Sequence, residues 1–259
     1  MVHIVGPPPQ GVVLFRGPSL LDGSPVVCVA TGLIHPSDNR ATGPMIQCWI
    51  LREDVDPVTA ERTGQDASVC GDCALRGNGC YVILHQAPLQ VWRAYHAGYY
   101  PSFQKKHAHL FRGREVRVGA YGDPAAVPTR VWERVLRLAG AHTGYTHQWR
   151  TCDQALRQWL MASVETPEQL QEARVLGWRT YRVRLSEEPL LEDEFVCPKS
   201  DEYEAEHGHR LMCVQCNACR GGEWAGQATP ATIVHGGIPV RVRYQRLRLS
   251  QRQAGAASS

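Results

Sequence analysis

The 259-residue sequence lacks several features that would place it in a familiar class. It has no G-x-G-x-x-G fingerprint, which argues against a dinucleotide-binding form of an α/β fold. No run of about 18 apolar residues occurs, so we expect no membrane span. Prolines interrupt the segment from Met1 to Leu14 where a signal peptide would need an unbroken apolar run. We therefore expect a soluble protein that stays in the cytoplasm.

Lysine is also scarce, because it occurs only at Lys105, Lys106 and Lys199 and every other basic residue is arginine. The net charge of +3 neither requires nor excludes a nucleic-acid partner. Apolar residues make up 43% of the chain and charged residues 20%, which is ordinary for a globular protein.

The ten cysteines are the most distinctive residues that are present. Disulfides are disfavoured in a reducing compartment, so tight cysteine spacing there indicates metal binding. The later set is a C-x-x-C-x-x-C run of Cys213, Cys216 and Cys219, with Cys197 or His235 as the candidate fourth ligand. Such spacing lets successive thiolates turn toward one ion, and zinc is the metal we expect there.

An earlier set consists of Cys70, Cys73 and Cys80, with no fourth ligand close in the sequence. Its fourth position would be filled from elsewhere in the chain by Cys28, Cys48, Cys152 or Cys197, or left open as in a catalytic zinc or a substrate-binding cluster. A reduced loop without metal is the remaining interpretation. Spacing alone does not choose between zinc and a 4Fe-4S cluster.

The pattern of apolar runs and turns predicts an α/β fold. Buried strands are expected at 26–30, 45–51, 115–121, 144–148, 160–164 and 178–185, with helices at 91–100 and 128–138 and after the capping pattern Thr166-Pro167-Glu168-Gln169. Strand–helix–strand occurs twice, which favours a (β/α) barrel, complete or incomplete, over an open doubly wound sheet. We expect an irregular lead-in over 1–25, one domain over 26–245 with cysteine-rich, metal-binding insertions at 70–80 and 197–219, and a flexible tail over 246–259.

Polar residues at predicted strand ends are the candidate site residues, because chemistry in α/β barrels occurs at the carboxyl ends of the strands. Asp123 follows the strand 115–121 as a catalytic carboxylate, a helix cap, or both. The candidate substrate-binding residues are Tyr145, His147, Gln148, Trp149 and Ser163. Glu165 and Asp153 are the candidates for a second acid.

Several of these stretches together resemble a family of uncharacterised bacteriophage gene products. The stretches are 37–43, Cys70-Gly-Asp-Cys73, Cys80-Tyr-Val, 119–126, Tyr145-Thr-His-Gln-Trp149 and Met161-Ala-Ser-Val164, and the resemblance covers about residues 26–240. A phage origin would place the protein in the host cytoplasm.

A more distant likeness is to the queuine-type tRNA-guanine transglycosylases and their phage relatives, which insert 7-deazaguanines into DNA. That resemblance implies a zinc held by three cysteines and a histidine, here Cys213, Cys216, Cys219 and His235. The sequence departs from that family in its cysteine spacing, in the lack of a second catalytic aspartate and in the early cysteine set.

The first hypothesis is therefore exchange of guanine for a small deazapurine in DNA, or secondarily in tRNA. Asp123 would attack the sugar, and Glu165 or Asp153 would protonate the leaving base. His147 and Gln148 would read the base edge while Trp149 or a tyrosine stacks on it.

The second hypothesis is an iron–sulfur enzyme on the same scaffold that resembles the radical SAM group. In it the early cysteines leave one iron open, and Cys197 joins the late cysteines around an auxiliary cluster. The third hypothesis is a non-enzymatic, zinc-stapled protein that binds nucleic acid.

Overall fold

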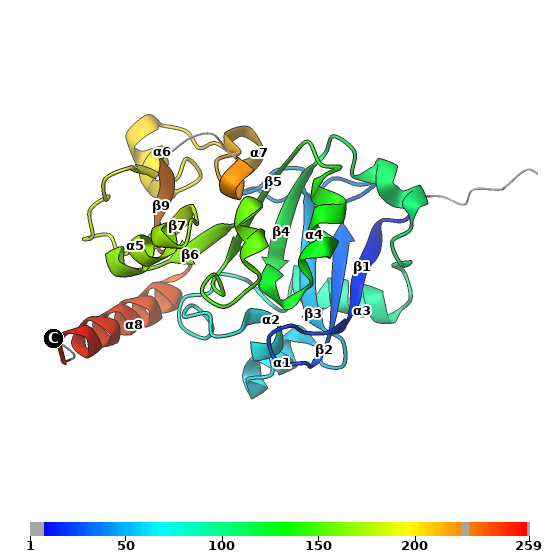
Figure 1. The fold of residues 1–259 in the computed structure, drawn as a ribbon, viewed down its shortest axis with the longest axis horizontal. Coiled ribbons are helices and arrows are strands. Elements are labelled where there is room, and N and C mark those ends of the chain that lie inside the picture. Colours follow the sequence, from blue (N-terminus) through cyan, green and yellow to red (C-terminus); the bar gives the residue numbers. More distant parts are fainter. Residues whose placement is uncertain (1–7, 224–227, 258–259) are drawn as a thin grey trace, which may run out of the picture.

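The computed structural model describes residues 8–223 and 228–257, and the strands within them form one open nine-stranded sheet (Figure 1). The strands are β1 (Gly11–Pro18), β2 (Pro25–Thr31), β3 (Ile46–Arg52), β4 (Glu115–Tyr121), β5 (Ala141–Thr146), β6 (Met161–Val164), β7 (Thr180–Arg184), β8 (Glu194–Val196) and β9 (Thr229–Ile233). Their order is β1-β2-β3-β4-β5-β6-β7-β9-β8, with β1 and β8 at the edges. The α/β class is therefore confirmed, and the described sheet is not closed.

The first three strands pair antiparallel, and every neighbouring pair from β3 onward is parallel. β2 and β3 are apolar on both faces and are buried on both, as expected for strands inside a sheet. β1 lies within the segment expected to be an irregular lead-in. Its run Val12-Val13-Leu14 is buried and supplies the apolar contact that orders this segment against β2.

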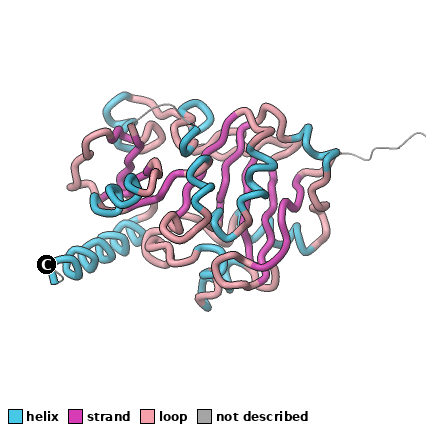
Figure 2. The backbone as a smooth tube through the Cα atoms, viewed as in Figure 1, coloured by secondary structure: helices cyan, strands magenta, loops and turns pink. Residues whose placement is uncertain are grey.

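The described helices are short except for the last one, and loops occupy much of the chain (Figure 2). They are α1 (Pro57–Thr63), α2 (Ala67–Cys70), α3 (Ala87–His96), α4 (Thr129–Leu136), α5 (Pro167–Val175), α6 (Asp201–His207), α7 (Cys213–Cys216) and α8 (Ile238–Ala257), with 3-10 turns η1 (Lys105–Leu110), η2 (Pro124–Ala126), η3 (Gln154–Gln158) and η4 (Gly221–Glu223). One large apolar cluster packs around β1 to β6, and a smaller cluster contains Leu75, Val183, Leu185, Val234 and Tyr244.

Capping interactions fix the positions where several predicted elements begin. The Thr166 hydroxyl accepts the Gln169 amide at 3.2 Å, and the Gln169 side chain accepts the Glu165 amide at 2.8 Å. This is the predicted capping box, with its backward bond shifted by one residue. It opens α5 and holds Glu165 at the end of β6.

The strand predicted at 144–148 lies earlier, because β5 covers Ala141–Thr146. His147 leaves the strand since its amide bonds the Asp123 carboxylate at 2.8 Å rather than a neighbouring strand. His147 and Gln148 therefore lie in the loop just beyond the carboxyl end of β5 and not within the sheet.

The segment from Arg246 onward, expected to be a flexible tail, continues α8 to Ala257. Two contacts fasten this helix: the Tyr244 hydroxyl donates to the Val183 carbonyl at 2.6 Å, and Arg248 pairs with Glu188 at 2.6 Å. Among the described residues, no helix combines the length and apolar character that crossing a membrane needs.

A buried ion pair joins β7 to β8. Arg182 bonds both oxygens of Glu194, at 2.7 and 2.6 Å, and the two side chains are 1% and 0% exposed. We expect Glu194→Gln to lower the free energy of unfolding by about 3 kcal/mol, because it leaves the buried guanidinium with only the more distant Glu188 carboxylate, at 3.9 Å.

Urea unfolding measures this change. The matched control is Glu172→Gln, which breaks an exposed bidentate pair with Arg150 and should cost less than about 1 kcal/mol. Equal costs for the two variants would contradict the role assigned to the buried pair.

His142 gives a second prediction, because burial lowers its pKa to about 4 from 6.5. It is 1% exposed and its Nε2 bonds the Trp159 carbonyl at 2.8 Å. As the pH falls below about 6.5, the unfolded chain takes up this proton before the folded chain does, so stability falls until about pH 4.

The expected loss is up to about 3 kcal/mol, from the size of the pKa difference. Unfolding free energies measured across this range should depend on pH less steeply in His142→Gln than in the unaltered protein. An unchanged slope in the variant would rule out His142 as the source.

Candidate functional site

Polar side chains gather where the parallel strands end. Asp123 follows β4 after Gly122, His147 follows β5 and Glu165 follows β6. Because β4, β5 and β6 are parallel neighbours, their carboxyl ends lie at one edge of the sheet. Ligands in open α/β sheets bind at that edge, so these side chains form the candidate site.

Asp123 is held on both carboxylate oxygens. Oδ1 accepts the Ala125 amide at 2.9 Å and the Thr146 hydroxyl at 2.7 Å, and Oδ2 accepts the His147 amide at 2.8 Å. Asp123 is 7% exposed, and burial raises its pKa although the nearby His147 and these donors favour the charged form. Asp123 therefore caps η2 and ties β4 to the turn after β5.

His147 and Glu165 form a close pair beside Asp123. His147 Nε2 lies 3.4 Å from Glu165 Oε1, and neither of these buried atoms has a hydrogen-bond partner of good geometry. Burial lowers the pKa of His147, but Cys73 and Glu165 beside the ring more than offset burial and raise this pKa well above 6.5. The pair can hold a proton at a buried position.

The early cysteines lie against the same pair. Cys70 ends α2, which Figure 1 shows near the carboxyl end of β4, and the Gln148 side chain donates to the Cys70 carbonyl at 3.3 Å. Burial raises the pKa of the Cys70 thiol, and its next neighbours, Cys73 and Cys80, raise it further. The three thiols of Cys70, Cys73 and Cys80, here called the edge cysteines, therefore form one group at the strand ends.

The loop that carries the edge cysteines is fixed by polar contacts. Arg76 pairs with Asp66 at 2.7 Å and donates to the Gly64 carbonyl at 2.8 Å. The side chain of Gln148 packs against Gly71, where a Cβ would lie 2.5 Å from the amide group. Gly71 also has φ +60, so a larger residue there would be strained and would push the cysteine loop off the edge.

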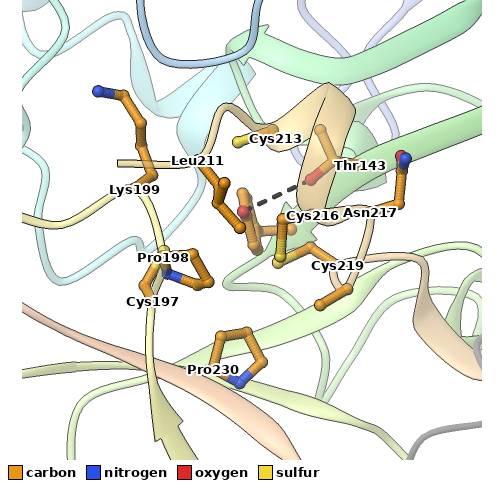
Figure 3. A pocket seen from close by; sticks show the side chains of 12 residues that line it. Thr143, Cys197, Pro198, Lys199, Leu211, Cys213, Cys216, Asn217, Cys219 and Pro230 are labelled. Carbon is orange, nitrogen blue, oxygen red and sulfur yellow. Dashed lines mark hydrogen bonds between the residues drawn. The ribbon is translucent and has the colours of Figure 1, made fainter. Parts of the chain in front are cut away.

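The late cysteines meet around a pocket on the same side of the sheet as Tyr145. The pocket is lined by Cys197, Cys213, Cys216 and Cys219, here called the pocket cysteines, together with residues that include Thr143, Tyr145 and Lys199 (Figure 3). Burial raises the pKa of the Cys219 and Cys197 thiols, whereas Tyr145 beside Cys219 and Tyr181 beside Cys197 each lower it. Burial raises the pKa of Cys213 to about 11, so this thiol is protonated at neutral pH unless an ion displaces the proton.

Backbone contacts hold the pocket cysteines in place. Cys213 donates its amide to the Ala41 carbonyl at 3.0 Å, and the Cys197 amide donates to the Ala231 carbonyl at 2.8 Å. Asn217 takes the left-handed conformation, with φ 52, which turns the chain between Cys216 and Cys219. Positions far apart in the sequence therefore share one pocket.

Within residues 8–223 and 228–257, no group of three or more His, Cys, Asp or Glu side chains has its donor atoms placed to hold a metal ion. The cysteines of each group are therefore neighbours, but their sulfur atoms do not point at one common position.

Other predicted site residues lie elsewhere. The His235 ring stacks 4.5 Å from the Tyr81 ring and is not among the residues that line the cysteine pocket. Trp149 is 1% exposed, with its indole nitrogen bonded to the Ser163 carbonyl at 3.1 Å, so it is a core residue rather than a free stacking surface. Asp153 caps η3 at the surface, where it accepts the Thr129 hydroxyl at 2.6 Å.

Two residues near both cysteine groups were not among the candidates taken from the sequence. Arg117 on β4 and Tyr81, which directly follows Cys80, meet through a 2.8 Å bond from Arg117 Nη2 to the tyrosine hydroxyl. The position of Arg117 inside the strand 115–121 was the available signal, because a charged residue in a buried strand needs a partner.

Asp123 provides the prediction from this geometry. Asp123→Asn replaces one acceptor oxygen by an NH₂ group that faces a bonded donor, and we expect a loss of about 1–3 kcal/mol of unfolding free energy. The matched control is Asp153→Asn, an exposed cap at which asparagine serves about as well as aspartate. Equal urea midpoints for the two variants would refute a structural role for the Asp123 network.

Comparison of this chain with protein-family models, with curated proteins and with solved structures found no match.

Proposed function

We propose that this protein is an iron–sulfur enzyme with one cluster at the edge cysteines and a second at the pocket cysteines. The observation that carries the proposal is the division of seven cysteines into a group of three at the strand ends and a group of four around a pocket. Three thiolates leave one iron of a 4Fe-4S cluster free for substrate, whereas four close a cluster completely.

The edge cysteines are the better placed of the two groups to hold the cluster that acts on substrate. They stand where ligands bind in parallel α/β sheets, and they follow β3, the first strand of the parallel series. No other cysteine joins them: Cys28 and Cys48 are fully buried within β2 and β3, and Cys152 has Asp123 and Asp153 as its charged neighbours. A cluster bound there would supply one-electron chemistry.

His147 and Glu165 would serve as the acid–base pair beside this centre. Glu165 is 3% exposed and its Oε1 has no hydrogen-bond partner, so it can accept a proton from substrate directly or through the His147 ring 3.4 Å away. Asp123 would position His147 through the 2.8 Å bond to its amide. Zinc with His147 as a fourth ligand is the competing interpretation of the same group.

The sheet order supports a barrel-type scaffold. Strands β3 to β7 stand in chain order, as in a (β/α) barrel, whereas a doubly wound sheet reverses its order at a switch point. We propose that this series forms part of a barrel wall. This arrangement and a set of three cysteines that would leave one iron open are the features in which the chain resembles the radical SAM group.

Base exchange through Asp123 is less well supported. A nucleophilic carboxylate must reach the substrate, but Asp123 is 7% exposed and is held by three donors from the fold itself. Gln148 is 6% exposed and bonded to the cysteine loop, and Trp149 is in the core, so neither is free to read or stack on a base. DNA and tRNA remain predicted partners, and none of these contacts among the described residues supports their binding.

Metal analysis of protein purified without oxygen tests the proposal. We expect brown protein with iron and sulfide near two 4Fe-4S equivalents, about eight irons per chain. Cys70→Ser and Cys216→Ser should each remove about half of the iron, since each breaks one group. The matched control is Cys152→Ser, which lies outside both groups and should keep the full iron content.

Colourless protein with stoichiometric zinc would overturn the iron–sulfur proposal. Loss of iron in Cys152→Ser equal to that in Cys70→Ser would overturn the assignment of ligands.

A further inference from the structure

Arg117 occupies an unusual position on β4, between the two cysteine groups. Successive side chains of a strand alternate between faces, and Arg117 pairs in register with Thr143, so it shares a face with Tyr145 and the pocket cysteines. Tyr121, four residues further along β4, has Cys70 and Cys80 as neighbours. Arg117 also bonds Tyr81, the residue directly after Cys80, so it has neighbours in both cysteine groups.

The guanidinium of Arg117 has no carboxylate partner among residues 8–223 and 228–257. Its Nη2 donates to the Tyr81 hydroxyl at 2.8 Å, and its other charged or polar neighbours include Tyr145 and Cys213. Buried arginines elsewhere in the chain do have acidic partners: Arg182 with Glu194, Arg184 with Glu202 and Arg248 with Glu188. Arg117 therefore retains N–H donors, in a planar fork, for an anion from outside the chain.

Further positive charge surrounds the same place. Arg117 and Lys199 both lie near Cys213, and both, together with Arg241, are electrostatic neighbours of the His235 ring. The acid beside His235 is Asp201, whose carboxylate pairs with Arg210 at 2.8 Å and Arg241 at 3.9 Å. In Figure 3 the Lys199 side chain extends away from the four cysteines, which leaves its ammonium free of that pocket.

The aromatic side chains here are accessible. Tyr81 is 43% exposed, and its ring lies 4.5 Å from that of His235. The Tyr81 hydroxyl anchors one edge of the guanidinium and so fixes the direction of the remaining donors. An anion that reaches Arg117 would approach past this ring pair.

We propose that Arg117, with Lys199 and Arg241, binds the phosphate group of an anionic substrate on the sheet face between the two cysteine groups. A guanidinium fork and two further cations match the charge and the several oxygens of a phosphate better than those of a carboxylate. The inference rests on the proposed function only in treating this anion as a substrate.

Titration of the full-length protein with inorganic phosphate, followed by calorimetry at fixed ionic strength, tests the site. We expect saturable binding that Arg117→Gln weakens by about tenfold or more, since it removes a charge-assisted fork. Arg117→Lys keeps the positive charge but lacks the planar fork, so its phosphate affinity should lie between those of the unaltered protein and Arg117→Gln. The matched control is Arg150→Gln, which removes an arginine paired with Glu172 at the surface and should bind phosphate like the unaltered protein.

Titration with acetate in parallel separates the two oxyanion types. Acetate binding tighter than phosphate binding would overturn the phosphate assignment. Equal phosphate affinity in Arg117→Gln and Arg150→Gln, or no saturable binding in the unaltered protein, would overturn the site itself.

Iron content measured on the same samples keeps this inference separate from the proposed function. Arg117→Gln should retain all of its iron, so loss of phosphate binding at full iron content supports the anion site. Protein that lacks iron but binds phosphate through Arg117 would refute the iron–sulfur proposal and leave the anion site standing.

Discussion

Parallel pairing of β3, β4, β5 and β6 is the constraint on which the rest of this structure depends. It brings the ends of four strands to one edge, and with them Asp123, His147 and Glu165. The Asp123 carboxylate then joins two of those ends, because it accepts donors from the turn after its own strand and from the end of β5. This buried carboxylate, which accepts three donors, therefore has a structural role at the edge, beside the His147–Glu165 pair.

Aromatic and cationic side chains lie between the edge cysteines at the strand ends and the pocket cysteines on the sheet face. Tyr81 follows directly on Cys80 and bonds Arg117, and Arg117 lies beside Cys213. Any substrate held on this face would contact elements from both halves of the chain. In the proposed chemistry, the substrate would therefore lie on β4 and β5, between the two loops that carry the cysteines.

The second half of the chain is held by charge as much as by apolar packing. Arg182 and Glu194 join β7 to β8, and Arg248 fastens α8 to Glu188. The apolar cluster in this part is small. Buried ion pairs with good geometry therefore determine which segments contact one another. The pocket cysteines lie in this part, with Cys213 and Cys216 at the two ends of α7.

The sequence by itself determined the α/β class, β4 at its exact bounds of 115–121, and the capped start of α5 at Thr166, because local periodicity and capping chemistry act over a few residues. It also marked both cysteine groups through their spacing. Tertiary structure alone decided that Cys197 rather than His235 joins the late cysteines, that β1 orders the lead-in, and that His147 faces Cys73. Those outcomes depend on contacts between residues far apart in the chain, such as that between the Tyr81 and His235 rings, and no local pattern encodes such contacts.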